Sequence, residues 1–94
     1  MNYRVRLSSG AQRDLARLED FLRAKAPAAA LRAATTIQRA VLSLRRVPER
    51  GRPYEIPDVR ELSVPFGGGG YVIRYIITAG EVIVLRIFHS LEGR

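Results

Sequence analysis

Two apolar runs near the C-terminus constrain the fold more than any other feature of the sequence. Residues Tyr71–Thr78 (YVIRYIIT) and Glu81–Phe88 (EVIVLRIF) are dense in β-branched and aromatic side chains, a composition that favours strands. An alanine–glycine pair separates these two runs. Before them, a further strand is expected over Val59–Pro65, and a glycine-rich turn is expected over Phe66–Gly70. The C-terminal third therefore predicts three consecutive strands.

The first quarter of the chain predicts a strand followed by an amphipathic helix. Residues Tyr3–Leu7 alternate between apolar and basic side chains, with the apolar ones expected to face the core. Ser8 or Ser9 can then cap a helix over Ala11–Lys25, because a serine oxygen accepts a free backbone N–H of the first turn. The apolar face of this helix is expected to consist of Leu15, Leu18 and Leu22, broadened by Phe21.

Pro27 separates this helix from a second one, because proline interrupts a helix interior but fits the first turn of a new helix. The second helix is expected from Ala28 to about Arg46, and Pro48–Asp58, with three prolines and a glycine, is expected to be a loop. The predicted fold class is α+β in the order β-α-α-β-β-β, with the N-terminal strand and a helical hairpin packed on a mostly antiparallel sheet. Residues 1–94 are expected to form a single domain.

Alternation along the last two strands predicts which side chains are buried. The inward set of the earlier strand is expected to be Tyr71, Ile73, Tyr75 and Ile77. The inward set of the last strand is expected to be Ile83, Leu85 and Ile87. The remaining residues would form an apolar outer face with arginines set in it: Val72, Arg74, Ile76, Val82, Val84, Arg86 and Phe88. Such a mixture is typical of a partner-binding surface, unless a third layer or a second copy covers it.

Composition excludes several kinds of site. The chain has no cysteine and a single histidine, so disulfides, thiolate zinc sites and multi-histidine metal sites are not expected, and no cofactor or metal is predicted. The longest apolar runs fall short of the roughly 20 residues that span a membrane, and the N-terminus has no hydrophobic signal segment. We therefore expect a cytoplasmic protein with no membrane partner.

The charge balance is strongly basic. Sixteen basic residues, all arginine except Lys25, oppose nine acidic ones and give a net charge of +7. This balance predicts attraction to a polyanion, which could be nucleic acid, a ribosome or an acidic protein segment. Arginine used simply for surface solubility is the alternative. A nucleic-acid-binding module is disfavoured, because the basic residues are spread over every predicted element.

Five short patterns, in order along nearly the whole chain, resemble those of the RelE/ParE toxin superfamily. They are AQRDL at Ala11–Leu15 followed by Leu18 and Phe21, P-x-x-G-R at Pro48–Arg52, V-R-E-L at Val59–Leu62, Y-x-ϕ-x-Y at Tyr71–Tyr75, and ϕ-ϕ-R-ϕ-ϕ-H at Val84–His89, where ϕ is apolar. The resemblance implies a growth-inhibiting toxin of a type II toxin–antitoxin system, of the kind linked to plasmid stabilization. It also implies a ParD- or RelB-like antitoxin that neutralises the toxin within a hetero-oligomer.

The resemblance also assigns expected roles to surfaces. The antitoxin would wrap the helical hairpin and the sheet, with its apolar residues near Leu15, Leu18 and Leu22. The free toxin would present the segment Arg86–Arg94, including Phe88, His89 and Arg94, to its target.

Three arginines on neighbouring strands are expected to form an anion-binding row on the outer face: Arg60, Arg74 and Arg86. The alternative is that these arginines pair with Glu55, Glu61 or Glu81.

The superfamily contains gyrase inhibitors (ParE-like) and ribosome-dependent mRNA endonucleases (RelE-like), and the resemblance favours the first branch. Nuclease members typically carry arginine directly after the tyrosine that opens the penultimate strand, where this chain has Val72. The tail after His89 holds no tyrosine and one basic residue. We therefore expect inhibition of DNA gyrase by binding, without a catalytic site. The alternative is cleavage of mRNA on the ribosome by Arg74, Arg86 and His89, with His89 a general base instead of a structural or partner-contact residue.

Overall fold

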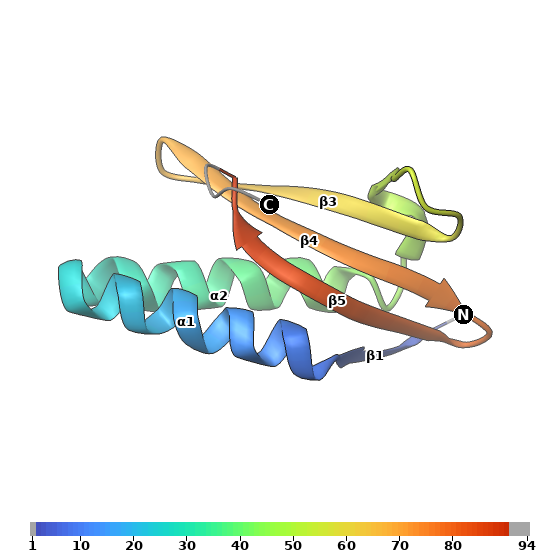
Figure 1. Ribbon diagram of the computed structural model, residues 1–94, viewed down its shortest axis with the longest axis horizontal. Coiled ribbons are helices and arrows are strands. Elements are labelled where there is room, and N and C mark those ends of the chain that lie inside the picture. Colours follow the sequence, from blue (N-terminus) through green and yellow to red (C-terminus); the bar gives the residue numbers. More distant parts are fainter. Residues whose placement is uncertain (1, 91–94) are drawn as a thin grey trace.

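The protein folds into one twisted five-stranded sheet with two helices packed along one side of it (Figure 1). The computed structural model describes residues 2–90. The helices are α1 (Ser9–Lys25) and α2 (Pro27–Ser43), and a short 3-10 helix, η1, spans Pro48–Arg50. The strands are β1 (Arg4–Leu7), β2 (Arg52–Pro53), β3 (Val59–Phe66), β4 (Gly69–Thr78) and β5 (Glu81–His89).

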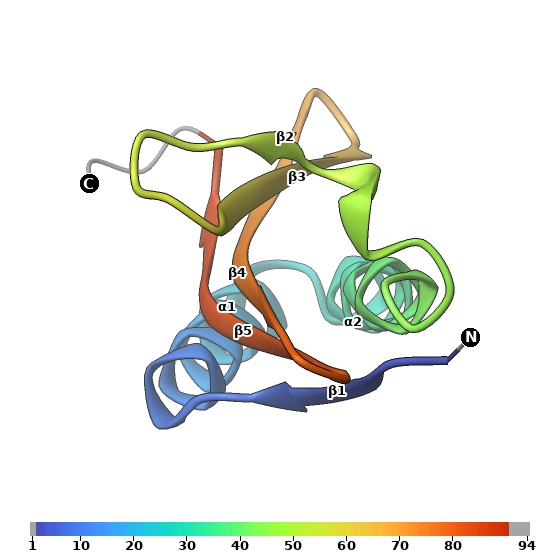
Figure 2. The same ribbon diagram turned by 90° about the vertical axis from the view of Figure 1, so that its right-hand side faces the viewer.

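The sheet is mixed, with the strand order β1-β5-β4-β3-β2. Strand β1 runs parallel to β5, and every other neighbouring pair is antiparallel. The end-on view shows β1 at one edge of the curved sheet and β2 at the other, with α2 held inside the curve (Figure 2). The predicted α+β class and element order are confirmed, and the sheet gains the two-residue strand β2 inside the segment expected to be a loop.

Both helices share one core with the concave face of the sheet. The inward set expected for β4 is confirmed, since Tyr71, Ile73 and Tyr75 are buried in this core and Ile77 packs against it. The expected face of α1 is also confirmed, because Leu18 is buried and Leu15 and Leu22 pack against the core. Phe21 is the exception. This residue is 58% exposed, so it does not broaden the buried stripe.

The predicted faces of the last strand are wrong over its first half. Val82 and Val84 are fully buried in the core, whereas Ile83 and Leu85 are only partly buried. Tyr75 pairs with Val84 but Arg74 pairs with Arg86, so Leu85 is an extra residue in β5. This β-bulge reverses the alternation, which is why Ile87, beyond it, faces the core as expected.

The ends of the second helix and the loops differ slightly from expectation. Pro27 begins α2 as predicted, but the helix ends at Ser43 instead of near Arg46. The turn expected over Phe66–Gly70 is only two residues long, since Phe66 closes β3 and Gly69 opens β4. No helix among residues 2–90 has both the length and the apolar character needed to cross a membrane.

The P-x-x-G-R segment is fixed to the sheet by Tyr75. The Tyr75 hydroxyl donates to the Pro48 carbonyl at 2.6 Å and accepts from the Gly51 N–H at 2.8 Å. A Cβ on Gly51 would lie 2.6 Å from the Tyr75 Oη and 2.9 Å from the Glu61 carbonyl oxygen, so only glycine fits. Burial raises the pKa of the Tyr75 hydroxyl.

Candidate functional site

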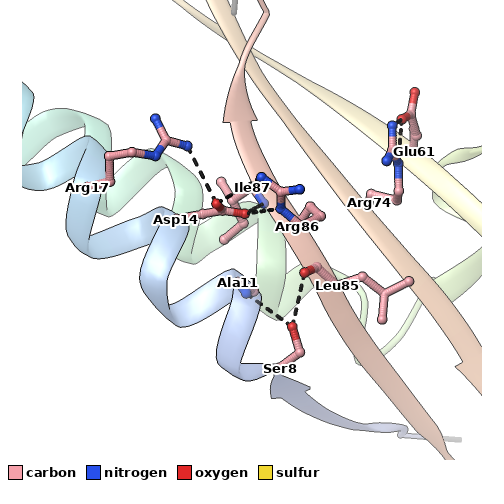
Figure 3. A network of polar contacts seen from close by, with 9 residues as sticks. All are labelled: Ser8, Ala11, Asp14, Arg17, Glu61, Arg74, Leu85, Arg86 and Ile87. Carbon is pink, nitrogen blue, oxygen red and sulfur yellow. Dashed lines mark hydrogen bonds and ion pairs between the residues drawn. The ribbon is translucent and has the colours of Figure 1, made fainter. Parts of the chain in front are cut away.

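Helix α1 replaces β1 along the edge of β5, at the point where the bulge interrupts the strand. Ser8 makes the connection, because its N–H donates to the Val84 carbonyl at 2.9 Å and its hydroxyl donates to the Leu85 carbonyl at 3.0 Å. The same hydroxyl oxygen accepts the Ala11 N–H at 3.1 Å, which confirms Ser8 as the helix cap (Figure 3). One side chain thus starts α1 and holds the bulged strand.

Asp14 completes this junction one turn further along α1. Its Oδ2 accepts the Ile87 backbone N–H at 2.9 Å and the Arg86 Nε at 2.7 Å, and its Oδ1 accepts the Arg86 Nη2 at 3.2 Å (Figure 3). Burial opposes ionisation of Asp14, but the hydrogen bonds from Arg86 and Ile87 outweigh it and hold the pKa of the carboxyl below its ordinary value. Asp14 therefore fixes the Arg86 guanidinium relative to the strand.

The sequence-based reasoning missed Asp14, although the sequence holds a signal. Asp14 lies three residues after Ala11 and four before Leu18, so it falls on the buried face of the helix. A lone carboxylate at such a position needs a buried hydrogen-bonding partner, and an arginine or a free strand N–H is a suitable one.

Arg74 and Arg86 lie on one face of the sheet, as expected, because they are paired across β4 and β5. The Arg74 Nε and Nη2 both donate to Glu61 Oε2, at 2.9 and 2.7 Å. The Arg74 guanidinium also lies 4.3 Å from the centre of the Tyr54 ring and 5.3 Å from that of Phe88. Both arginines of the outer face therefore have a carboxylate partner within the chain.

Arg60 does not join this row, so the expected set of three is wrong. Arg60 is paired with Tyr75, whose side chain points into the core, and Glu61 takes the outer position opposite Arg74. Neighbouring residues of a strand point to opposite faces of the sheet, so a shift of one residue changes the face. The sequence alternation alone did not determine which face Arg60 would occupy. The Arg60 guanidinium instead donates to the carbonyls of Gly51, at 2.7 Å, and Glu49, at 3.2 Å.

His89 lies on the opposite face from the two outer arginines. It is paired with Tyr71, a core residue, and the two rings meet edge to face with their centres 5.5 Å apart. A Cβ on Gly69 would lie 3.2 Å from the His89 Cε1, so His89 packs closely over the start of β4. Phe88 lies on the outer face and is buried there. Arg94 lies outside the described residues.

The three leucines expected to meet an antitoxin occupy different environments. Leu18 is buried in the core. Leu15 lines a groove of about 320 Å³ between α1 and α2. Leu22 lines a larger groove, of about 660 Å³, between α1 and the turn that joins β3 to β4. The sequence-based reasoning missed this second groove, because its walls come from Phe21, which was expected to be buried, and from residues expected to form a turn.

Comparison with known proteins places the chain in a family. The model of the ParE toxin of the type II toxin–antitoxin system parDE matches residues 5–93. The chain is 43% identical to Toxin RelE1 of Caulobacter vibrioides over 94 residues, covering 100% of both chains. It is 40% identical to Toxin RelE3 of the same organism over 90 residues, covering 96% of this chain and 97% of the relative.

Solved structures agree with this placement. The chain superposes on one from the chromosomal ParDE system of P. aeruginosa with a TM-score of 0.81 and 27% identity, covering 93% of this chain and 95% of the other. It superposes on a chain of the Mycobacterium tuberculosis toxin–antitoxin complex RelBE2 with a TM-score of 0.62 and 26% identity, covering 95% and 99%. The chain therefore belongs to the ParE toxin family of type II toxin–antitoxin systems.

Proposed function

We propose that this toxin inhibits DNA gyrase by binding it, has no catalytic site of its own, and is neutralised by a cognate antitoxin. Gyrase acts on DNA in the cytoplasm, so the proposal also places the toxin there. The free toxin presents the end of β5 and the segment after it, from Arg86 to Arg94, to the target. The antitoxin covers part of the helical hairpin and the sheet in a hetero-oligomer.

The separation of His89 from Arg74 and Arg86 is the observation that carries the proposal. Cleavage of RNA through a ribose 2′-hydroxyl needs a base, cations for the developing phosphorane charge and an acid, all at one phosphate. The strand pairing puts the two arginines on the outer face and His89 on the core face. This arrangement supports the proposal, because the three residues expected to form the catalytic set of a nuclease face opposite sides of the sheet.

The carboxylate partners of the arginines support the same reading. Arg74 is only 19% exposed, and it is held by Glu61 and the ring of Tyr54. Arg86 is 52% exposed and is held by Asp14. A phosphate would have to compete with both carboxylates, whereas a protein partner can use the exposed part of Arg86 without displacing Asp14.

An antitoxin partner is supported by the solved structures that resemble this chain. Those structures are described as a ParDE toxin–antitoxin system and as the toxin–antitoxin complex RelBE2. The net charge of +7 favours an acidic segment as the neutralising partner.

Two assays with purified toxin test the proposed target. We expect supercoiling of relaxed plasmid by gyrase to fall as toxin is added, while mRNA on stalled ribosomes stays intact in primer-extension analysis. Toxin already bound to its antitoxin serves as the control and should leave supercoiling unchanged. Ribosome-dependent cuts with gyrase unaffected would overturn the proposal.

Cleavage of mRNA on the ribosome is the second candidate function. The observation that favours it is the name RelE carried by the two Caulobacter vibrioides relatives. If the chain is a nuclease, His89→Gln should lower mRNA cleavage at least about 100-fold, the usual contribution of a general acid or base. Cleavage that survives His89→Gln unchanged would remove the proposed general base from this alternative.

A further inference from the structure

The excess of positive charge is concentrated in one part of the chain, although arginines occur in every predicted element. The segment from Phe21 to Pro48 holds six basic residues and no acidic one, whereas the rest of the chain holds ten basic and nine acidic residues. Helix α2 lies wholly within this segment. Almost all of the net charge of +7 therefore comes from α2 and the residues that flank it.

Four polar side chains form a line along one flank of α2: Arg32, Thr36, Arg39 and Ser43. They follow one another at spacings of three and four residues, which places them side by side on the helix surface. The flank on the other side of α2 faces α1, because Ala34, Gln38 and Val41 line the groove between the two helices. The line of polar residues is therefore turned away from α1.

Arg50 of η1 extends this line. Its Nη1 donates to the Ser43 Oγ, and the Ser43 hydroxyl donates to the Ala40 carbonyl at 2.6 Å. A third guanidinium is thereby held at the end of the line. We name the five residues the arginine ridge: Arg32, Thr36, Arg39, Ser43 and Arg50. The part on α2 alone is about 16 Å long, which is the rise of about five base pairs of duplex DNA.

The guanidinium groups of the arginine ridge are not neutralised by the described part of the chain. No ion pair formed within residues 2–90 includes Arg32, Arg39 or Arg50. Arg86, by contrast, is held by Asp14. Arg32 and Arg39 are also exposed to solvent. The ridge can therefore accept an external anion without displacing a carboxylate of the chain.

We propose that the arginine ridge binds the phosphate backbone of duplex DNA. The contacts are to phosphates and not to base edges, so they carry no preference for a DNA sequence. The ridge is distinct from the end of β5, which we assign to the protein target. Only the choice of DNA as the polyanion rests on the proposed function, since gyrase brings duplex DNA to the bound toxin.

The composition of the arginine ridge favours a polyanion over a folded protein partner. The centre of a protein interface is rich in apolar and aromatic side chains that a partner buries. The ridge offers only guanidinium and hydroxyl groups, and the exposed leucines of α2, Leu31 and Leu42, lie outside it. Arginine guanidinium groups and serine or threonine hydroxyls are common ligands of backbone phosphates.

Salt titrations of DNA binding test the proposal. The free toxin is titrated into a fluorescently labelled DNA duplex, and binding is followed by anisotropy. Three phosphate contacts should weaken binding at least about 40-fold between about 50 and about 200 mM salt. The double substitution Arg32→Gln with Arg39→Gln removes two of these contacts. It should weaken binding at least about tenfold at low salt and lower the slope of log affinity against log salt by about 1.8.

A matched pair of substitutions separates the ridge from the net charge. Arg4→Gln with Arg13→Gln removes the same charge from exposed positions on β1 and α1. This variant should keep its affinity within about threefold and its salt slope within about 0.5 of the unsubstituted toxin. Equal effects of the two double substitutions would overturn the proposal, because DNA binding would then follow the net charge alone. A toxin that binds no DNA at low salt would overturn it as well.

Two further measurements identify the polyanion and the residues that hold it. An RNA duplex of the same sequence should bind more weakly than the DNA, and tighter or equal binding of the RNA would overturn the assignment to DNA. Bound DNA should protect Arg32 and Arg39, but not Arg13, from modification by phenylglyoxal, as followed by peptide mass spectrometry. Equal modification of all three in the saturated complex would contradict the proposal. These experiments contain no gyrase, so their failure is distinguishable from failure of the proposed target.

Discussion

Two junctions tie distant segments of the chain to the β4–β5 pair, and they differ in chemistry. At one, the neutral hydroxyl of Tyr75 holds the backbone of Pro48 and Gly51 in a buried site. At the other, the ionised Asp14 holds the bulged part of β5 and a half-exposed Arg86. The first junction closes the core, and the second orients a surface cation. We therefore expect the Tyr75 junction to contribute more to stability. We expect the Asp14 junction to contribute more to interaction with partners.

The largest loss of stability is expected from Gly51→Ala. The new Cβ would lie 2.6 Å from the Tyr75 Oη and 2.9 Å from the Glu61 carbonyl oxygen, so the loop must move and lose its hydrogen bonds. We expect a free energy of unfolding lower by about 3 kcal/mol, measured in urea. Gly68→Ala is the control: its Cβ meets no atom within 4 Å, and a change below about 0.5 kcal/mol is expected.

Tyr75→Phe should have the next largest effect. Removing the hydroxyl leaves the Pro48 carbonyl and the Gly51 N–H without this partner in a buried site. We expect a loss of about 2 kcal/mol in the same urea experiment. A loss below about 0.5 kcal/mol would mean that the hydroxyl is not what holds the loop.

Asp14→Asn should cost less at neutral pH, about 1 kcal/mol, and should remove an acid dependence. The pKa of Asp14 is lowered in the folded state, so its stabilisation is fully present above about pH 4 and is lost as pH falls through the folded-state pKa. The pKa of Tyr75 is raised, so its contribution is present below about pH 10 and is lost as pH rises. The free energy of unfolding should therefore depend less on pH between pH 2 and pH 5 in Asp14→Asn. In Tyr75→Phe it should still fall steeply as the pH is lowered through this range.

The smallest effect on stability is expected from Arg86→Ala. Arg86 is 52% exposed, and in its absence Asp14 keeps the Ile87 N–H and the contact with Arg17. We expect a loss below about 1 kcal/mol. If Arg86→Ala costs more than Tyr75→Phe, the comparison between the two junctions is wrong.

The sequence predicted the fold well because its strongest signals are local. Helical spacing in α1, Pro27 at the start of α2 and the β-branched runs of β4 and β5 each determine one element without reference to the rest. The order of these elements then leaves few ways to build a sheet with two helices against it.

The candidate site was less predictable because it depends on register and on pairing between distant residues. The bulge at Leu85 reverses which side chains of β5 face the core, and no local property of the residues predicts this bulge. Arg60 was placed on the wrong face for the same reason, since one residue decides the face. Asp14 and Arg86 are 72 residues apart, so the pair becomes visible only in the folded chain.

A stoichiometric titration of gyrase tests most directly whether the toxin acts by binding. Supercoiling activity is measured after a fixed time with toxin at fractions and multiples of the gyrase concentration. We predict a loss that grows in proportion to the toxin added and is complete only near or above equimolar toxin. Unchanged supercoiling at large excess, with ribosome-bound mRNA cut at toxin concentrations far below that of the ribosomes, would contradict the account.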